Sequence, residues 1–151
     1  MAKQNKNIEI ISMNDDEIAQ RNRVAAPRCI LIVEDDPDMR LLNAAALTDA
    51  GYRVETAEDG AVGWAALNRK HYDLLITDNA MPKVTGVELL KKLSVAHIAL
   101  PVIMASGVLP FEEFAHSPWL QPSATLLRPY NVETLLATVK RVLSVIHVSP
   151  A

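Results

Sequence analysis

The fold of this chain is decided by residues 74–82, which read LLITDNAMP. The apolar run in this stretch ends abruptly at Asp78, and Pro82 follows four residues later. An apolar run that stops at an acid predicts a buried strand that reaches the edge of a sheet. We therefore expect Asp78 at the carboxyl end of a strand, which is where ligands bind in open parallel α/β sheets.

Four more apolar runs lie outward from this stretch, two before it and two after it, with helical patterns between them. The expected strands are 29–33, 52–56, 72–78, 101–105 and 124–127, and the expected helices start near residues 37, 60, 86, 111 and 132. Five strands that alternate with five helices require a parallel sheet with helices on both faces. The predicted fold class is α/β, a doubly wound five-stranded parallel sheet with strand order 2-1-3-4-5.

The composition is that of one globular domain with polar ends. The chain is 50% hydrophobic and 22% charged, and its formal net charge of −3 argues against a nucleic-acid partner. Residues 1–27 are rich in polar side chains and are predicted to form a flexible tail. We expect the domain to cover residues 28–148 and a short C-terminal tail to cover residues 149–151.

The sequence also argues against a membrane or secreted location. No stretch approaches the roughly 18 continuous apolar residues of a membrane span, and the polar N-terminus lacks the apolar core of a signal peptide. The single cysteine, Cys29, excludes a disulfide within the chain. We therefore predict a cytoplasmic protein.

Polar side chains stand where the predicted strands end. Asp35 and Asp36 follow the first strand, Asp78 ends the third, Ser106 follows the fourth, and Arg128 follows the fifth. Crowded carboxylates repel one another unless a cation is present, and oxygen-rich sites suit Mg²⁺. A hydroxyl and a guanidinium at the same edge supply the donors and positive charge that a phosphoryl group needs. The pattern predicts Mg²⁺-dependent phosphoryl transfer onto Asp78, whose carboxylate would form an acyl phosphate.

The first acidic pair has a plainer alternative interpretation. Asp35 and Asp36 stand directly before Pro37, so they can also cap the N-terminus of a helix, where negative charge is favourable. The third acid, Asp78, favours the metal site over this alternative.

With these residues in place, the chain from about residue 28 to 148 resembles a receiver domain of the two-component response regulators, which has a CheY-like, flavodoxin-like fold. The resemblance rests on Asp35-Asp36, residues 74–82, the turn glycine Gly86, residues 104–107 and residues 128–130. The acidic pair, the stretch that contains Asp78 and the glycine are specific in combination.

The resemblance implies a bacterial signalling domain whose only chemistry is its own phosphorylation and dephosphorylation. Asp78 would accept phosphate from a phosphohistidine on a sensor histidine kinase or a histidine phosphotransfer protein. Asp36 would be the acid nearer to Mg²⁺, Asp35 would act partly through water, and the backbone carbonyl of Ala80 would complete the metal ligands. The fourth helix, fifth strand and fifth helix would form the face that docks a downstream protein or a second copy.

Three features of the chain are compared with the family pattern, and they involve four positions. Arg128 stands where the family usually has lysine, and a planar guanidinium does not replace a compact ammonium conservatively. Thr125 stands where the family often has an inward-turning aromatic ring. In the family, the positions that Ala80 and Val108 occupy here flank the attacking water. Neither of these side chains can hydrogen-bond a water, so we expect slow dephosphorylation, with a longer phosphate lifetime than in an Ala80→Asn variant.

Two other functions stay open. A dehalogenase-like Mg²⁺-dependent phosphatase also uses an aspartate nucleophile, but it needs a second acid where this chain has Ala80, and a cap domain for which the chain has no room. A pseudo-receiver that binds partners without phosphate is favoured by Arg128 and disfavoured by the complete set of acids. The sequence leaves open whether the domain acts alone or within a larger protein.

Overall fold

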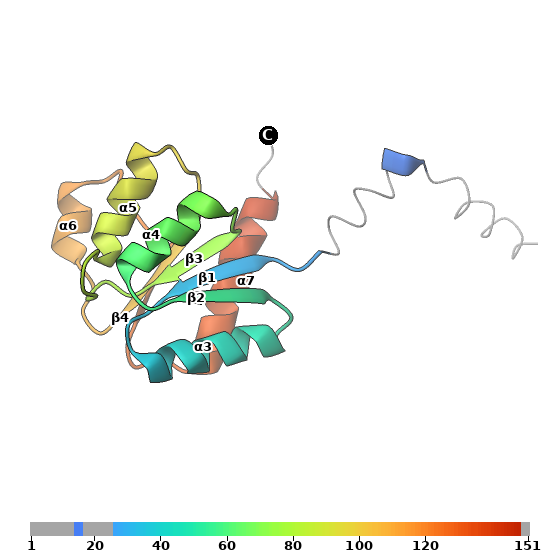
Figure 1. Cartoon of the computed structure of the whole chain (residues 1–151), viewed down its shortest axis with the longest axis horizontal. Helices are drawn as coiled ribbons and strands as arrows, with labels where there is room; N and C mark the ends of the chain where they lie inside the picture. The colour runs from blue at the N-terminus through green and yellow to red at the C-terminus, as the bar shows by residue number, and fades with distance from the viewer. Residues whose placement is uncertain (1–13, 17–25, 149–151) are drawn as a thin grey trace, which may run out of the picture.

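The computed structural model describes residues 14–16 and 26–148. The tails expected at residues 1–27 and 149–151 lie almost entirely outside these described residues. From residue 29 onward, five strands alternate with five helices (Figure 1). In chain order the elements are β1 (Cys29–Val33), α3 (Pro37–Asp49), β2 (Arg53–Ala57), α4 (Gly60–Arg69), β3 (Leu74–Thr77), α5 (Gly86–Val95), β4 (Val102–Ser106), α6 (Phe111–His116), β5 (Ala124–Leu127) and α7 (Val132–Val148).

The strands form one parallel sheet in the order β2-β1-β3-β4-β5. This order confirms the predicted doubly wound α/β fold. The chain runs outward from β1 to β2, returns past β1 to β3, and then continues to β4 and β5. The reversal lies between β1 and β3, so the ends of these two strands flank the crevice where such sheets bind ligands.

Helices cover both faces of the sheet, and each face has its own apolar core (Figure 1). Ile30 and Ile32 of β1 pack toward α3 and α7, whereas Leu31 and Val33 pack toward α4, α5 and α6. Side chains of a strand alternate between faces, so a strand that is covered on both sides must be apolar at every position. This explains the continuous apolar run at residues 29–33.

Three strands end one residue away from the predicted position. β2 extends to Ala57, and the other two shifts involve residues of the candidate site. β3 ends at Thr77, so Asp78 is the first residue beyond the strand, and β4 extends to include Ser106. Both shifts leave the polar side chains at the carboxyl edge of the sheet. All five strands are parallel, so this edge gathers the residues that follow each of them.

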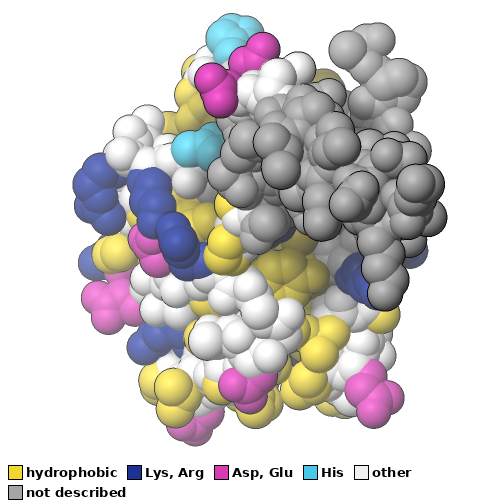
Figure 2. Space-filling model, turned by 90° about the vertical axis from the view of Figure 1, so that its right-hand side faces the viewer, with side chains coloured by type: hydrophobic (Ala, Val, Ile, Leu, Met, Phe, Trp, Pro, Cys, Tyr) yellow, Lys and Arg dark blue, Asp and Glu magenta, His cyan; other side chains and the backbone are white. Residues whose placement is uncertain are grey.

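The surface carries charges of both signs, and Figure 2 shows basic and acidic side chains beside one another on one face. This distribution agrees with the small formal net charge of −3. Among the described helices, none has the length and apolar character needed to cross a bilayer.

Candidate functional site

Asp78 occupies the centre of the carboxyl edge, at the end of the middle strand β3. Its backbone N–H donates to the carbonyl of Val33 at 3.1 Å, which continues the pairing of β1 with β3. Its side chain is buried, and Oδ1 accepts the N–H of Asn79 at 2.7 Å. The hydroxyl of Thr77 donates to the Asp78 carbonyl at 2.8 Å. The strand and these bonds hold the carboxylate in one place.

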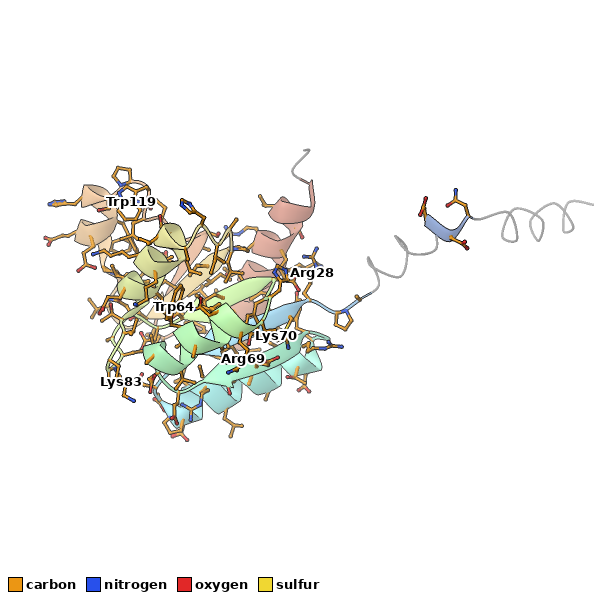
Figure 3. The ribbon with its side chains drawn as sticks, turned by 45° about the horizontal axis from the view of Figure 1, so that its top comes forward. Arg28, Trp64, Arg69, Lys70, Lys83 and Trp119 are labelled. Carbon is orange, nitrogen blue, oxygen red and sulfur yellow. The ribbon has the colours of Figure 1, made fainter. Side chains whose placement is uncertain are left out.

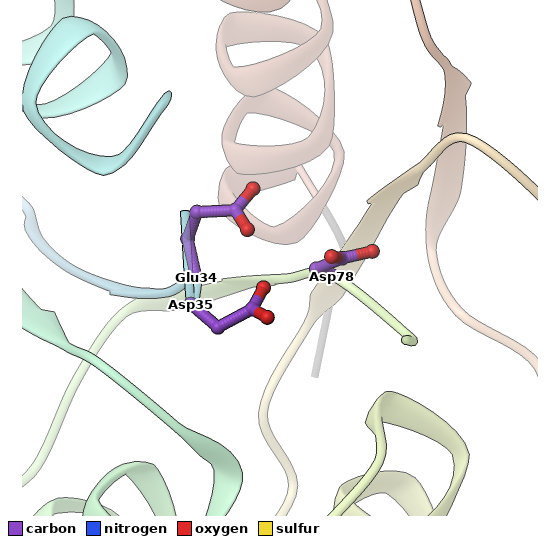
Figure 4. Close-up of side chains that lie close together, drawn as sticks. All are labelled: Glu34, Asp35 and Asp78. Atoms are coloured by element: carbon purple, nitrogen blue, oxygen red, sulfur yellow. The ribbon is translucent and has the colours of Figure 1, made fainter. Parts of the chain in front are cut away.

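Two further acids from the end of β1 reach the same spot. Carboxylate oxygens of Glu34, Asp35 and Asp78 all lie within 4.8 Å of one another (Figure 4). Glu34 is buried, whereas Asp35 is exposed to solvent. These three carboxylates form a cluster with one side open to water, and we call them the acidic cluster.

Asp36 is not a member of this cluster, which corrects the expectation that it is the acid nearest to the metal. Its carboxylate Oδ1 accepts the backbone N–H groups of Asp38 at 2.9 Å and Met39 at 3.5 Å. Asp36 thus caps α3, whose first residue is Pro37. The first N–H groups of a helix have no partner within the helix, so the residue before it turns its side chain toward them.

The sequence argument missed Glu34, which takes the place expected for Asp36. Glu34 directly follows Val33, the last residue of β1, and its N–H donates to the carbonyl of Ala57 at 3.1 Å. The signal was present in the chain. Proline at the first helical position marks the preceding residue, Asp36, as the helix cap. The acids that remain at the end of β1 are then Glu34 and Asp35.

Arg128 joins β5 to the acidic cluster. Its guanidinium forms an ion pair with Glu34 through Nη2, and its Nη1 lies 3.7 Å from Oδ2 of Asp78. The Nε atom is buried and has no hydrogen-bond partner among the described residues. Arg128 therefore bridges two of the three acids and still has one donor free.

Ser106 lies at the same edge, as predicted, between Asp78 and Arg128 in the order of the strands. It is the last residue of β4, and its side chain is buried. Its carbonyl accepts the N–H of Arg128 at 2.9 Å, so the ends of β4 and β5 are joined directly. The structure thus brings Asp35, Asp78, Ser106 and Arg128 to one edge, together with Glu34.

The loop between β3 and α5 is drawn tightly against Asp78. The N–H of Gly86 donates to the carbonyl of Asn79 at 3.1 Å, and the N–H of Val87 donates to Asn79 Oδ1 at 3.0 Å. A Cβ atom at residue 86 would lie 2.5 Å from the Asp78 carbonyl oxygen, so only glycine permits this approach. The exposed Ala80 lies in the loop that these contacts close.

The donor set of the acidic cluster fits a hard divalent cation. It consists of three carboxylates, and Mg²⁺ prefers oxygen ligands and retains several waters, for which the open side at Asp35 leaves room. Without a cation, Arg128 offsets part of the negative charge. The cluster can therefore exist in the absence of metal and still attract one.

Comparison with known proteins shows the family of the chain. The profile of the response regulator receiver domain matches residues 30–140. The chain belongs to the response regulator receiver family. Receiver domains are the signalling domains of two-component systems, and this receiver domain has their characteristic sheet order.

Relatives and solved structures agree with this. The sensor protein EvgS of Escherichia coli K12 is 32% identical over 121 residues, which are 80% of this chain and 10% of EvgS. The chemotaxis response regulator CheY4 of Vibrio cholerae has a TM-score of 0.70 and 32% identity, over 78% of this chain and 99% of that structure. The response regulator TrrA of Thermotoga maritima, solved in complex with Mg²⁺ and BeF, has a TM-score of 0.66 and 25% identity over 76% and 98% of the two chains.

The receiver domain thus spans only 10% of the length of EvgS. What the two chains share is this domain, and the activities of the whole sensor protein belong to EvgS.

Proposed function

We propose that this receiver domain accepts a phosphoryl group on Asp78 in a Mg²⁺-dependent reaction. The observation that carries the proposal is the convergence of the neighbouring acids Glu34 and Asp35 with Asp78, which is distant from them in the sequence. The guanidinium of Arg128 lies beside these acids. Metal-binding acids, a buried nucleophile and a phosphate-binding cation are the groups that phosphoryl transfer requires.

The donor would be a phosphohistidine on a sensor histidine kinase or a histidine phosphotransfer protein. An Asp78 carboxylate oxygen attacks phosphorus, so a P–O bond forms while the P–N bond to the histidine breaks. The electron pair of that bond stays on the imidazole nitrogen. Asp78 is suited to this role because its other contacts hold the carboxylate at the strand end with the acidic cluster open on one side.

Glu34, Asp35 and Asp78, with the carbonyl of Ala80, would hold the metal ion. Mg²⁺ at this place would offset the negative charge that gathers on the phosphoryl oxygens. TrrA, a response regulator with a similar fold, was solved in complex with Mg²⁺ and BeF, and this supports the same chemistry here.

Ser106 and Arg128 would bind the remaining phosphoryl oxygens. The hydroxyl of Ser106, at the end of the adjacent strand, would donate one hydrogen bond. The free Nε–H of Arg128 supports a second, because a buried donor without a partner is costly and an anion beside Asp78 would satisfy it.

We propose α6, β5 and α7 as the face that meets a downstream protein or a second copy. Several large apolar side chains on and around α6 and β5 are exposed, and these are Val108, Phe111, Trp119 and Leu127. Exposed large apolar side chains favour an interaction site, and these four lie between residues 108 and 127 of the chain. We place residues 28–148 in the receiver domain and, because a kinase forms its phosphohistidine from ATP, we place the domain in the cytoplasm. We infer no catalysis beyond its own phosphorylation and dephosphorylation.

A second candidate is a receiver-like module that binds partners without phosphate. The ion pair of Arg128 with Glu34 favours it, because the guanidinium already occupies part of the acidic cluster. Acetyl phosphate with Mg²⁺ separates the two. Phosphate acceptance predicts a mass increase of one phosphoryl group in the parent chain, none in an Asp78→Asn variant, and none in the parent after removal of Mg²⁺ with EDTA. An unchanged parent mass would favour the phosphate-independent module.

A further inference from the structure

The loop between β3 and α5 (residues 79–85, the β3–α5 loop) is held at two points. At its start, Asn79 accepts hydrogen bonds from the beginning of α5, as described above. At its far end, the loop crosses to the first turn of α4. Between these two points lies Ala80, whose carbonyl is the proposed metal ligand that comes from this loop.

One contact at the far end is an ion pair. Lys83 Nζ lies 3.4 Å from Oδ2 of Asp59, the residue that caps α4. The other oxygen of Asp59, Oδ1, accepts the N–H of Val62 at 2.8 Å. The Asp59 side chain is 8% exposed, so the pair is shielded on its acidic side. The hydrogen bond from Val62 and, to a lesser extent, the contact with Lys83 lower the pKa of Asp59.

The backbone supports the same placement. Lys83 has φ of +69°, a left-handed conformation that residues other than glycine adopt rarely. A Cβ atom at Gly60 would lie 1.9 Å from the carbonyl oxygen of Val84, so the loop backbone rests directly on the start of α4. The side chain and the backbone therefore tie the loop to the same turn of α4.

We propose that Asp59 and Lys83 form a clamp that positions the β3–α5 loop, so that the Ala80 carbonyl faces the metal site. Both are positioning residues for Mg²⁺ binding, and this inference rests on the proposed function. Without the clamp, the loop has more conformations to lose when the metal binds, and the apparent affinity falls with the fraction of loops in the competent conformation.

Removal of Lys83 has opposite expected effects on Mg²⁺ binding under two explanations. If Lys83 acts only through long-range charge, loss of its positive charge strengthens cation binding. If Lys83 is part of the clamp, its loss weakens cation binding. Lys83→Asn suits the experiment because asparagine tolerates the left-handed backbone. Lys83→Arg restores the charge and the reach, and Lys91→Gln removes an exposed lysine from α5 as the matched control.

Mg²⁺ alone is titrated into each full-length variant by calorimetry. We expect the dissociation constant to rise roughly threefold in Lys83→Asn, the order of effect of a partly exposed ion pair, and to stay near the parent value in Lys83→Arg and Lys91→Gln. Hydrogen exchange at the amides of Met81 and Val84, which are bonded within the loop, is expected to quicken only in Lys83→Asn.

Equal or tighter Mg²⁺ binding by Lys83→Asn would overturn the clamp and leave the proposed function standing. Absence of Mg²⁺ binding by the parent chain itself would overturn both. Weaker binding in Lys83→Asn with the arginine variant restored supports the clamp.

Discussion

At the scale of single residues, membership of the acidic cluster depends on a register of one position. Glu34, Asp35 and Asp36 are consecutive, yet the first two join the acidic cluster and the third caps α3. The division follows from where β1 stops and where Pro37 starts a helix. Adjacent acids of the same charge therefore have different roles, two in the acidic cluster and one as a helix cap.

This division can be tested with two substitutions that remove the same charge. Glu34→Gln is expected to raise the Mg²⁺ dissociation constant by at least about tenfold, because even partners outside the ligand set often contribute that much. Asp36→Asn should change it little, since asparagine caps a helix as well as aspartate does. Calorimetric titration with Mg²⁺ measures both. A larger effect of Asp36→Asn would return Asp36 to the metal site.

Arg128 is the second residue whose side-chain type affects the candidate site. Its planar fork spans Glu34 and Asp78 together, which a single ammonium group would do less firmly. We expect this hold to restrain the movement of Arg128 when a phosphoryl group arrives, and so to weaken the coupling of phosphorylation to conformation.

The substitution Arg128→Lys tests this restraint. We expect beryllofluoride with Mg²⁺ to cause larger changes in the amide chemical shifts of β5 and α6 in the lysine variant than in the parent, because lysine exchanges its partners more freely. Asp78→Asn serves as the control without an acceptor. Shift changes of the same size in parent and lysine variant would contradict the restraint.

At the scale of elements, the loop that carries Arg128 is tied to the first helix of the domain. The side-chain amide of Asn43, buried in α3, donates to the hydroxyl of Tyr130 at 3.0 Å. Tyr130 follows Arg128 by two residues and packs against the core on the α3 and α7 side. This bond links the helix capped by Asp36 with the loop after β5.

Removal of the hydroxyl in Tyr130→Phe leaves the Asn43 amide buried without its partner. We expect the free energy of unfolding to fall by about 1–2 kcal/mol, as for other buried polar groups left unsatisfied. The double variant Asn43→Leu/Tyr130→Phe should recover much of the loss, because replacing both partners by apolar groups is often nearly neutral. Urea unfolding measures both values, and a Tyr130→Phe variant as stable as the parent would show that the bond is dispensable.

At the scale of the whole molecule, the two ends of the strands carry different groups of charged residues. The acidic cluster follows the carboxyl ends of β1 and β3. Figure 3 shows Lys83 at one end of the domain, and Arg28 and Lys70 toward the opposite end. Near that end, Glu55 of β2 forms an ion pair with Lys70 and accepts the hydroxyl of Tyr72 at 2.9 Å. These contacts join β2 to the segment that leads into β3, away from the acidic cluster.

The Glu55 contacts predict a pH dependence of stability. The hydrogen bonds from Lys70 and Tyr72 lower the pKa of Glu55 below its ordinary value of 4.5. The folded state then binds the proton more weakly than the unfolded state, so Glu55 stabilises the fold above pH 4.5 and this contribution is lost as the pH falls through the lowered pKa.

A Glu55→Gln variant should lose this part of the pH dependence. Its free energy of unfolding is expected to lie below that of the parent at pH 7 and to approach it in acid, while Mg²⁺ affinity stays unchanged because the proposed metal site lies at the carboxyl ends of the strands. Denaturant unfolding between pH 3 and pH 7 measures the difference. A difference that does not depend on pH would contradict the role of the charged carboxylate.

The sequence by itself determined the fold and most of the site. The apolar runs at residues 29–33 and 74–76 indicate strands because a strand covered on both faces is apolar at nearly every position, and a polar residue at the end of such a run lies near the edge of the sheet. The same pattern predicted that Asp78, Ser106 and Arg128 lie at one edge of the sheet. It also predicted the strand order and the resemblance to the receiver family.

Only the tertiary structure decided which partners these residues take. The exchange of Asp36 for Glu34, the bridge from Arg128 to two acids, and the contact of Lys83 with Asp59 all depend on directions that side chains take in space. Periodicity along a chain reports which face a residue belongs to, but the choice between a helix cap and a metal site depends on the angle at which the next element leaves the strand. That angle is set by packing of segments distant in sequence.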